Sequence, residues 1–429
     1  MKKLHRLHAW LKLDAWHKLH AWHQLPALWF KSLKWRHGVL IALLILVTLT
    51  KMIPLWGFIY TYRIYPAIGT LLSPISGIFP FAVGDIFIAL SIAWVILYPI
   101  YEIGLRKKLA KRFIFLKPRN SQNIRNGCYP TKKRIFGRVA EYLLWVYAWF
   151  YIAWGLNYSQ PNIYVRIGMK PVEVSKAKFK KFAYQYADSL NALSNASLSN
   201  ASLSNARKSI SPDSIVDDAL KNRVRDAVLK EYNKIGYQKG INRPFNQHPH
   251  AKTMVFTPIS SMAGVTGSMG PFFCEFTLNG DILAHDYPAT YAHEFAHFLG
   301  VANEGEANFY SYIVCTASED KQVRFSGYYH IFFHVLNNVF DILGEKEGER
   351  FLKHIRPEII QRARNDRHYW LSKRCKALDA AQDVIFELYL RGNHVAEGRK
   401  SYSGVIGLIL AWEEKIKKQE IPSHKKGNS

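Results

Sequence analysis

Three long apolar segments near the N-terminus constrain the fold of this chain most strongly. Residues 38–59 are apolar except for Lys51, residues 81–100 are apolar except for Asp85, and residues 139–156 are rich in Leu, Trp, Tyr and Ala. Each segment is long enough to cross a hydrocarbon core of roughly 30 Å. Tyr and Trp gather at their ends, as interfacial anchors do. We therefore predict three transmembrane helices that anchor the chain in a lipid bilayer.

Positive charge is concentrated beside these segments. Residues 1–36 carry eight Lys/Arg against one acid, Asp14, and residues 106–138 carry twelve against none, whereas the predicted loop at residues 60–80 holds only Arg63. Because basic loops stay in the cytoplasm, we predict a cytoplasmic N-terminus and an extracytoplasmic domain. Were the cell bacterial, the anchor would lie in the plasma (inner) membrane and the domain would be periplasmic. The net charge of +26 then needs no nucleic-acid partner, since no aromatic-basic recognition motif accompanies it.

The chain divides into three predicted parts. Residues 1–37 form a basic, Trp/His-rich tail with a period-six repeat, residues 38–156 hold the spans, and residues 157–429 form the extracytoplasmic domain. Within that domain, residues 193–206 repeat Leu-Ser-Asn-Ala-Ser. Asn and Ser favour turns over helix interiors, so this stretch is predicted to be a flexible, low-complexity insert.

Four cysteines are too few for a disulfide scaffold. Cys128 falls in the basic segment predicted to be cytoplasmic. Cys274, Cys315 and Cys375 fall in the outer domain, where the sequence permits one disulfide without indicating its partners.

Helical patterns dominate the outer domain, which we predict to be mainly α within an α+β fold. Helices are expected at 171–190, 214–235, 303–318, 326–343, 346–364, 368–391 and 401–418. Short strands are expected at 253–257 and 272–279, with a loop between them that is punctuated by Gly264, Gly267 and Gly270.

The motif His293-Glu294-Phe295-Ala296-His297 carries the most chemical information. On a helix, residues four apart share one face, so both imidazoles can bind one metal ion. Glu294 is offset by one residue and can reach a water molecule as general base. Pro288 and Gly300 bound the predicted helix, because proline suits a first turn and glycine a C-terminus. The spacing therefore predicts a catalytic zinc site.

A catalytic zinc normally takes three protein ligands. Glu304 and Glu306 follow the motif closely. With Asn303 as N-cap, Glu306 occupies the third helical position and completes a capping-box-like pair. Asn308 lies one helical turn from Glu304 and can orient its carboxylate. We therefore predict Glu304 as the third ligand, with Glu306 as the alternative.

These residues carry a resemblance. H-E-x-x-H followed by E-x-x-A-N resembles the gluzincin metalloproteases, and the run HEFAHFLGVANEGEANF resembles a bacterial membrane-protein family catalogued as domain of unknown function 3810. The resemblance implies a zincin-like metalloprotease domain that holds Zn²⁺ through His293, His297 and either Glu304 or Glu306. It also implies that Glu294 is the general base in hydrolysis of a protein or peptide substrate. By the same analogy, the strand at 273–278 would be the edge strand that pairs with an extended peptide.

Weaker candidates accompany this site. His330 and His334 also stand four residues apart, without an acid between them, and are expected to be helix-face histidines. Tyr328 or Tyr329 is a candidate donor to a developing oxyanion. The alternative function is a catalytically inactive zincin-like membrane protein that serves as a metal-binding or scaffold module. The intact Glu294 favours the enzyme, since a purely structural site needs no base.

Overall fold

A computed structural model describes most of the chain. The described residues are 34–115, 132–172, 175–198, 216–236, 240–247, 249, 251–378 and 404–420. Most of the predicted N-terminal tail, residues 116–131 with Cys128, and residues 199–206 of the predicted insert lie outside them.

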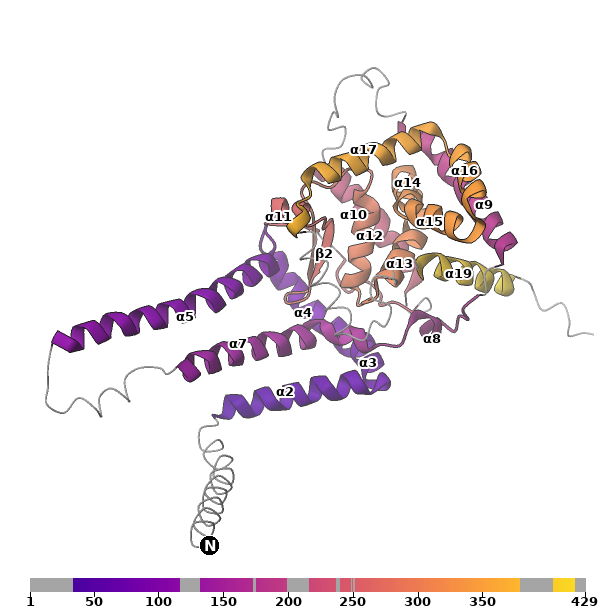
Figure 1. The fold of residues 1–429 in the computed structure, drawn as a ribbon. Coiled ribbons are helices and arrows are strands. Elements are labelled where there is room, and N and C mark those ends of the chain that lie inside the picture. Colours follow the sequence, from indigo (N-terminus) through magenta and orange to yellow (C-terminus); the bar gives the residue numbers. More distant parts are fainter. Residues whose placement is uncertain are drawn as a thin grey trace, which may run out of the picture.

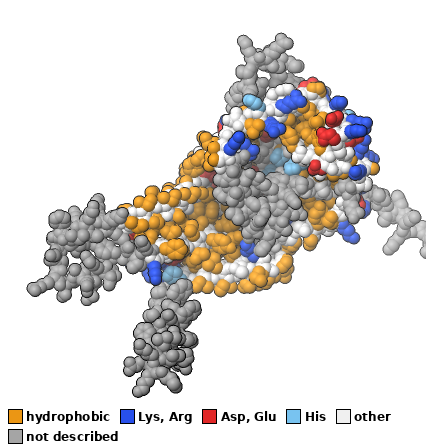
Figure 2. Space-filling model, viewed as in Figure 1, with side chains coloured by type: hydrophobic (Ala, Val, Ile, Leu, Met, Phe, Trp, Pro, Cys, Tyr) orange, Lys and Arg blue, Asp and Glu red, His pale blue; other side chains and the backbone are white. Residues whose placement is uncertain are grey.

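Three long helices form the N-terminal part. Helices α2 (Trp35–Met52), α5 (Val83–Phe115) and α7 (Lys132–Ala153) lead away from the remaining elements, and α7 contacts both of the others (Figure 1). Helix α2 and the stretch Val83–Gly104 of α5 are long and apolar enough to cross a membrane. Few of their side chains are buried, and hydrophobic side chains cover this part of the surface (Figure 2). Two candidate membrane spans are thus present near the N-terminus.

The third predicted span is also helical, with different bounds. Helix α7 begins with Lys132, Lys133 and Arg134 and ends at Ala153, before the predicted limit at residue 156. A 3₁₀ turn, Gly155–Ser159, follows it and is partly buried. A membrane crossing by α7 therefore stays a prediction.

The segment 60–80 was predicted to be a loop, and this was wrong. After α2 come α3 (Pro54–Ile59), a π-helical turn η1 (Tyr60–Ile64) and α4 (Tyr65–Gly77). Pro66 lies in the first turn of α4, where its missing N–H removes no helical hydrogen bond. Gly69 lies within α4, although glycine disfavours helix interiors. A Cβ on Gly69 would lie 2.4 Å from the Phe245 ring, so glycine allows the α4 backbone to approach that ring. Helix α4 is thus held by long-range packing.

Helices form most of the outer domain. They are α8 (Ile163–Ile167), α9 (Lys176–Leu198), α10 (Asp218–Ile235), α11 (Thr257–Met262), α12 (Tyr287–Phe298), α13 (Glu304–Ala317), α14 (Lys321–His330), α15 (Phe332–Leu343), α16 (Glu345–His354), α17 (Pro357–Lys373) and α19 (Gly404–Glu420). The helix expected at 326–343 is instead broken at Ile331. The helix expected at 368–391 has no counterpart as one element, since α17 ends at Lys373 and residues 379–391 lie outside the described part.

The start of the predicted flexible insert is helical. Helix α9 continues through Leu198, so residues 193–198 belong to it. The buried Ser194 satisfies its hydroxyl within the helix by donating to the Asn191 carbonyl at 2.8 Å. The Ala and Leu residues of the repeat therefore outweigh the turn preference of its Asn and Ser residues here.

A small sheet lies beside α12. Strands β1 (Lys252–Thr253), β2 (Gly267–Gly270) and β3 (Glu275–Leu278) follow the order β1-β3-β2, with β1 parallel and β2 antiparallel to β3. Strand β3 is fully buried. Strand β2 falls in the segment predicted to be a glycine-punctuated loop, and that prediction was wrong. Within the described residues, β2 pairs with β3 alone and is an edge of the sheet.

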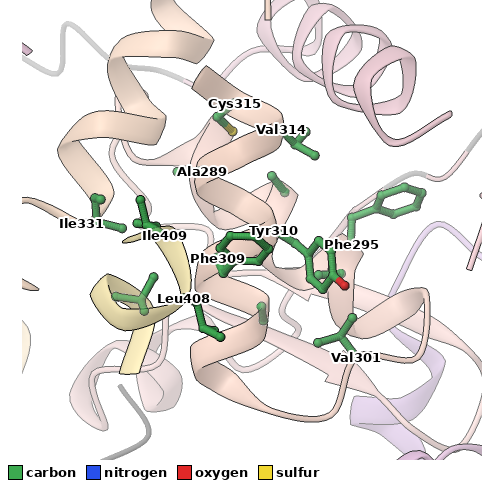
Figure 3. Close-up of a cluster of buried hydrophobic side chains, with 14 of the residues drawn as sticks. Ala289, Phe295, Val301, Phe309, Tyr310, Val314, Cys315, Ile331, Leu408 and Ile409 are labelled. Atoms are coloured by element: carbon green, nitrogen blue, oxygen red, sulfur yellow. The ribbon is translucent and has the colours of Figure 1, made fainter. Parts of the chain in front are cut away.

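One hydrophobic core joins the outer domain to the ends of the N-terminal helices. Buried side chains of α12 and α13 pack with Ile331, which lies between α14 and α15, and with Leu408 and Ile409 of α19 (Figure 3). The same cluster includes Tyr65, Tyr151 and Trp154 from the N-terminal helical part. Cys274, Cys315 and Cys375 are unpaired, and burial raises the pKa of Cys274 and Cys315 to about 12. The described part of the outer domain thus holds together by packing, without a disulfide.

Candidate metal centre

Helix α12 carries the motif in the interior of the molecule. Asp286 precedes it, Pro288 occupies its first turn, and every residue from Tyr287 to Phe298 is buried. Gly300 adopts a left-handed φ of 95°, which favours glycine and turns the chain away after the helix. Tyr291, Phe295 and Phe298 stack along the opposite face of α12, so packing fixes which face the polar motif side chains occupy.

Three side chains converge beside α12. The Nε2 atoms of His293 and His297 lie 3.1 Å apart, and Glu304 Oε2 lies 3.2 Å from the first and 3.5 Å from the second. Glu304 is the first residue of α13, and α13 packs closely on α12. One ligand atom from each residue lies within 4.8 Å of the others. Two imidazoles and a carboxylate are a ligand set that catalytic zinc takes.

The outer nitrogens of both imidazoles are held by hydrogen bonds. His297 Nδ1 donates to the Val301 carbonyl at 2.6 Å, and His293 Nδ1 donates to Asn308 Oδ1 at 2.8 Å. Each bond leaves Nε2 as the ring nitrogen that faces Glu304. Partners of this kind fix the tautomer and the ring orientation of metal-binding histidines. Asn308 was predicted to orient Glu304, and its observed partner is His293 instead.

Electrostatics keep Glu304 charged. Burial opposes ionisation, but the two imidazoles outweigh it and hold the pKa of Glu304 well below its ordinary value. Burial would lower the pKa of His297, whereas Glu304 raises it to about 9. The cluster therefore balances a negative carboxylate with positive charge, and a divalent cation would satisfy the same demand.

Glu294 lies beside this cluster and is poorly satisfied. It is buried, and among the described residues its Oε2 has no hydrogen-bond partner. Burial raises the pKa of Glu294, with opposing contributions from His293 and His297. Strand β2 lies against it, because a Cβ on Gly267 would meet Glu294 Oε1 at 2.4 Å. A buried, unpaired carboxylate oxygen costs free energy unless water or a ligand reaches it. The unpaired oxygen of Glu294 could therefore accept a hydrogen bond from a bound water molecule.

Glu306 lies elsewhere. Its carboxylate accepts from the Ile163 backbone N–H at 2.9 Å and pairs with the buried Arg166 at 2.6 Å. The Asn303 side chain caps α13 by accepting from the Glu306 N–H at 3.0 Å. The structure thus brings Glu304 to the histidines and gives Glu306 a structural ion pair, instead of the predicted capping-box contact.

His330 borders the cluster, and His334 does not contact it. His330 Nε2 donates to Asn308 Oδ1 at 3.0 Å, and its ring centroid lies 6.0 Å from that of His293. Burial lowers the pKa of His330 to about 3, so the ring is neutral. One amide oxygen therefore accepts hydrogen bonds from two imidazoles, which its two lone pairs allow.

The two candidate tyrosines have other partners. Tyr329 donates its hydroxyl to Asp366 at 2.5 Å, and the Tyr328 ring packs against Tyr186 and Tyr312. Neither contact connects a tyrosine hydroxyl with the histidine cluster.

The C-terminal carbonyls of α12 are capped from distant segments. The Trp154 indole N–H donates to the His297 carbonyl at 3.0 Å, and the Tyr65 hydroxyl donates to the Phe298 carbonyl at 2.6 Å. Asn242 Nδ2 then donates to the Leu299 carbonyl at 2.9 Å. Helix ends leave such carbonyls without helical partners. These supporting residues were not predicted, because nothing local in the sequence relates them to the motif.

The strand next to the cluster is β2. The segment 273–278 was predicted to be a peptide-pairing edge strand, but β3 lies in the middle of the sheet with neighbours on both sides. Within the described residues β1 and β2 are the two edges of the sheet, and β2 is the edge that contacts α12. The prediction was wrong because a Gly-rich segment carries none of the β-branched or aromatic signal of a strand.

A second polar cluster lies at the other end of α12. His285 Nε2 lies 2.8 Å from Asp366 Oδ2 and 3.7 Å from Asp286 Oδ1. Arg362 Nη1 lies 3.2 Å from His285 Nδ1, and Tyr329 also donates to Asp366. The guanidinium at Nδ1 and the carboxylate at Nε2 engage both ring nitrogens of His285, which leaves neither nitrogen for a cation. We assign this network to the docking of α17 on the start of α12.

Comparison with known proteins gives one match. Residues 60–410 match a family described as protein of unknown function (DUF3810). No curated protein matches, and no solved structure matches. The matched region includes both the H-E-x-x-H helix and the segments that carry Tyr65 and Trp154, which cap its C-terminal end.

Proposed function

The chain belongs to the DUF3810 family, whose description states no activity, and we propose from its own site that it is a membrane-anchored zinc-dependent metallopeptidase. The observation that carries this proposal is the convergence of three ligand atoms beside an unpartnered base. His293, His297 and Glu304 would hold the zinc ion, and Glu294 Oε2 is the buried atom without a partner. This is also the arrangement that the gluzincin resemblance implies.

The residues divide the work of peptide hydrolysis between them. When bound, zinc supplies Lewis acidity, which polarises the scissile carbonyl and lowers the pKa of a water molecule. Glu294 accepts the proton of the attacking water at its carboxylate and returns it to the leaving amine as the C–N bond breaks. Asn308 and the Val301 carbonyl hold the two imidazoles in the tautomer that this ligation requires.

We infer the cellular setting from the apolar helices and the basic segments. Two apolar helices, with α7 as the proposed third span, would hold the chain in the plasma membrane of a bacterium. The basic segments would keep the N-terminus in the cytoplasm, so that the outer domain with its peptide or protein substrate lies in the periplasm.

The test uses the full-length protein in nanodiscs. We expect one zinc ion per chain by elemental analysis, and cleavage of a randomised peptide library detected by mass spectrometry. Glu294→Gln should abolish cleavage and retain zinc, whereas Glu319→Gln, at an exposed ion pair, should change neither. Zinc binding without any Glu294-dependent cleavage would favour the inactive scaffold. Absence of zinc from the folded protein would refute the proposal.

A further inference from the structure

The candidate metal centre lies directly at the end of a membrane-side helix. Trp154 follows the last residue of α7, and its ring packs edge-on against the His297 ring with centroids 6.3 Å apart. Its indole N–H also donates to the His297 carbonyl. No linker therefore separates the catalytic face from the anchor.

Strand β2 leads from the site toward the apolar helices. Its first residue, Gly267, lies against Glu294, and its last, Gly270, lies against Gly84 in the first turn of α5. Two residues later, the Phe272 ring lies 4.9 Å from the Phe87 ring of α5, and the Phe272 carbonyl accepts from the Trp149 indole. The outer edge of β2, which has no strand partner among the described residues, thus runs between the base and the start of a candidate membrane span.

Exposed apolar residues lie near the start of α5, beside the end of β2. Ile78, Phe79 and Phe81 connect α4 to α5, and Val255 and Phe256 precede α11. The Val255 N–H donates to Asp85 at 2.8 Å, which joins the two groups. Hydrophobic side chains continue from the long helices onto the base of the outer domain (Figure 2). Aromatic residues at the end of an apolar helix are typical of a bilayer surface, so this rim places the surface beside the far end of β2.

We propose that the substrate is a polypeptide tethered in the same membrane, cleaved where it leaves the bilayer. This rests on the proposed peptidase function. An extended segment emerging at the rim would add to the outer edge of β2 through main-chain hydrogen bonds. Because antiparallel pairing is the more stable arrangement, the segment would run from Gly270 toward Gly267, with its membrane tether N-terminal to the scissile bond.

The length of β2 sets the position of the cut. Its four residues span about 10 Å at roughly 3.3 Å per residue, and Phe272 lies two residues further on, in the turn that joins β2 to β3. A chain that leaves the bilayer beside Phe272 therefore presents to Glu294 a bond about four to six residues from its membrane span.

The experiment reconstitutes the full-length protein in liposomes with four substrates that share one randomised window. In the first, the window directly follows a single transmembrane span. In the second, a flexible Gly/Ser spacer of about 30 residues, reaching roughly 30 Å, separates window from span. The third is the free peptide library, and a fourth substrate, with the span C-terminal to the window, tests the direction of pairing. The Glu294→Gln variant provides the background in every arm.

We expect the adjacent, N-terminally tethered window to be cut at least about tenfold faster than the distant window. Tethering gives both windows a raised local concentration, so the difference in rate reports the distance from the membrane span. The spacer arm thus separates position from concentration. Equal or faster cleavage of the distant window or of the free peptide would overturn the inference while leaving the peptidase intact. A faster C-terminally tethered substrate would overturn antiparallel pairing. Absence of Glu294-dependent cleavage in all arms would refute the peptidase function and this inference with it.

Discussion

Gly267 and Glu294 are in close contact across the boundary between β2 and α12. A methyl group on Gly267 would lie 2.4 Å from Glu294 Oε1 and 2.6 Å from its Cγ. Since Glu294 sits on a buried helix, its side chain and not the backbone would have to move. The contact fixes the distance between the proposed base and the proposed substrate-binding edge.

We predict that Gly267→Ala reduces peptide cleavage by about 100-fold or more, because a displaced general base forfeits its usual 10²–10⁴-fold contribution. Zinc content should stay unchanged, since none of the three ligand atoms lies against Gly267. Turnover numbers and zinc stoichiometry of the purified protein check both points. Ser268→Ala, at the exposed next position of β2, is the matched control. Unchanged turnover in Gly267→Ala would contradict the role given to Glu294.

Removal of the Glu304 carboxylate should weaken metal binding. We expect Glu304→Gln to lower zinc affinity by more than the roughly 10–100-fold that loss of a ligand's hydrogen-bonding partner costs. Competition with a chromogenic chelator measures the affinity, and circular dichroism monitors folding. Unaltered affinity in the folded variant would mean that another residue completes the site.

Glu306 should matter for stability instead. Arg166 and Glu306 form a buried pair, with side-chain exposures of 2% and 6%, and removing one partner of such a pair costs about 3–5 kcal/mol. We therefore expect Glu306→Ala to lower the free energy of unfolding by that amount in denaturant titrations, and the remaining folded protein to keep its zinc. Glu319→Ala, at an exposed pair with Lys230, should leave stability unchanged. Loss of zinc from folded Glu306→Ala would reverse the assignment of the two glutamates.

Asn308 should act on the metal through His293. Asn308→Ala removes the acceptor for His293 Nδ1 and should lower zinc affinity by about 10–100-fold. Asn308→Asp keeps an oxygen in place and should restore most of the affinity. If both variants bind zinc equally weakly, the amide acts through packing and not as the acceptor that fixes the tautomer.

Local signals in the sequence predicted the motif helix well. Pro288 and Gly300 bound α12 in the structure, and Asn303 caps α13 as expected. These features depend on residues within one or two turns of each other, so their physics is contained in a short stretch of chain. The resemblance to domain of unknown function 3810 is likewise confirmed by the match over residues 60–410, whereas the gluzincin resemblance stays a prediction.

Such local signals could not predict contacts between residues that are far apart in the sequence. Asn308 has Glu304 one turn away along its own helix, but α12 brings His293 closer, and only the packing of the two helices decides between them. Strand β2 exists because β3 offers a partner, although its own Gly-Ser-Met-Gly sequence has little strand preference. Helix α4 was missed because its buried surface depends on Phe245 and the end of α12.

The capping of α12 by Tyr65 and Trp154 bears on how this protein can be isolated. Both residues precede residue 157, where the outer domain would begin if it were cut free. A water-soluble fragment starting there would lose the Tyr65 donor to the Phe298 carbonyl and the Trp154 donor that supplements the Gly300 N–H at the His297 carbonyl, together with aromatic rings of the shared core. Purification should therefore retain the anchor, and the choice of detergent becomes a variable of the active site itself.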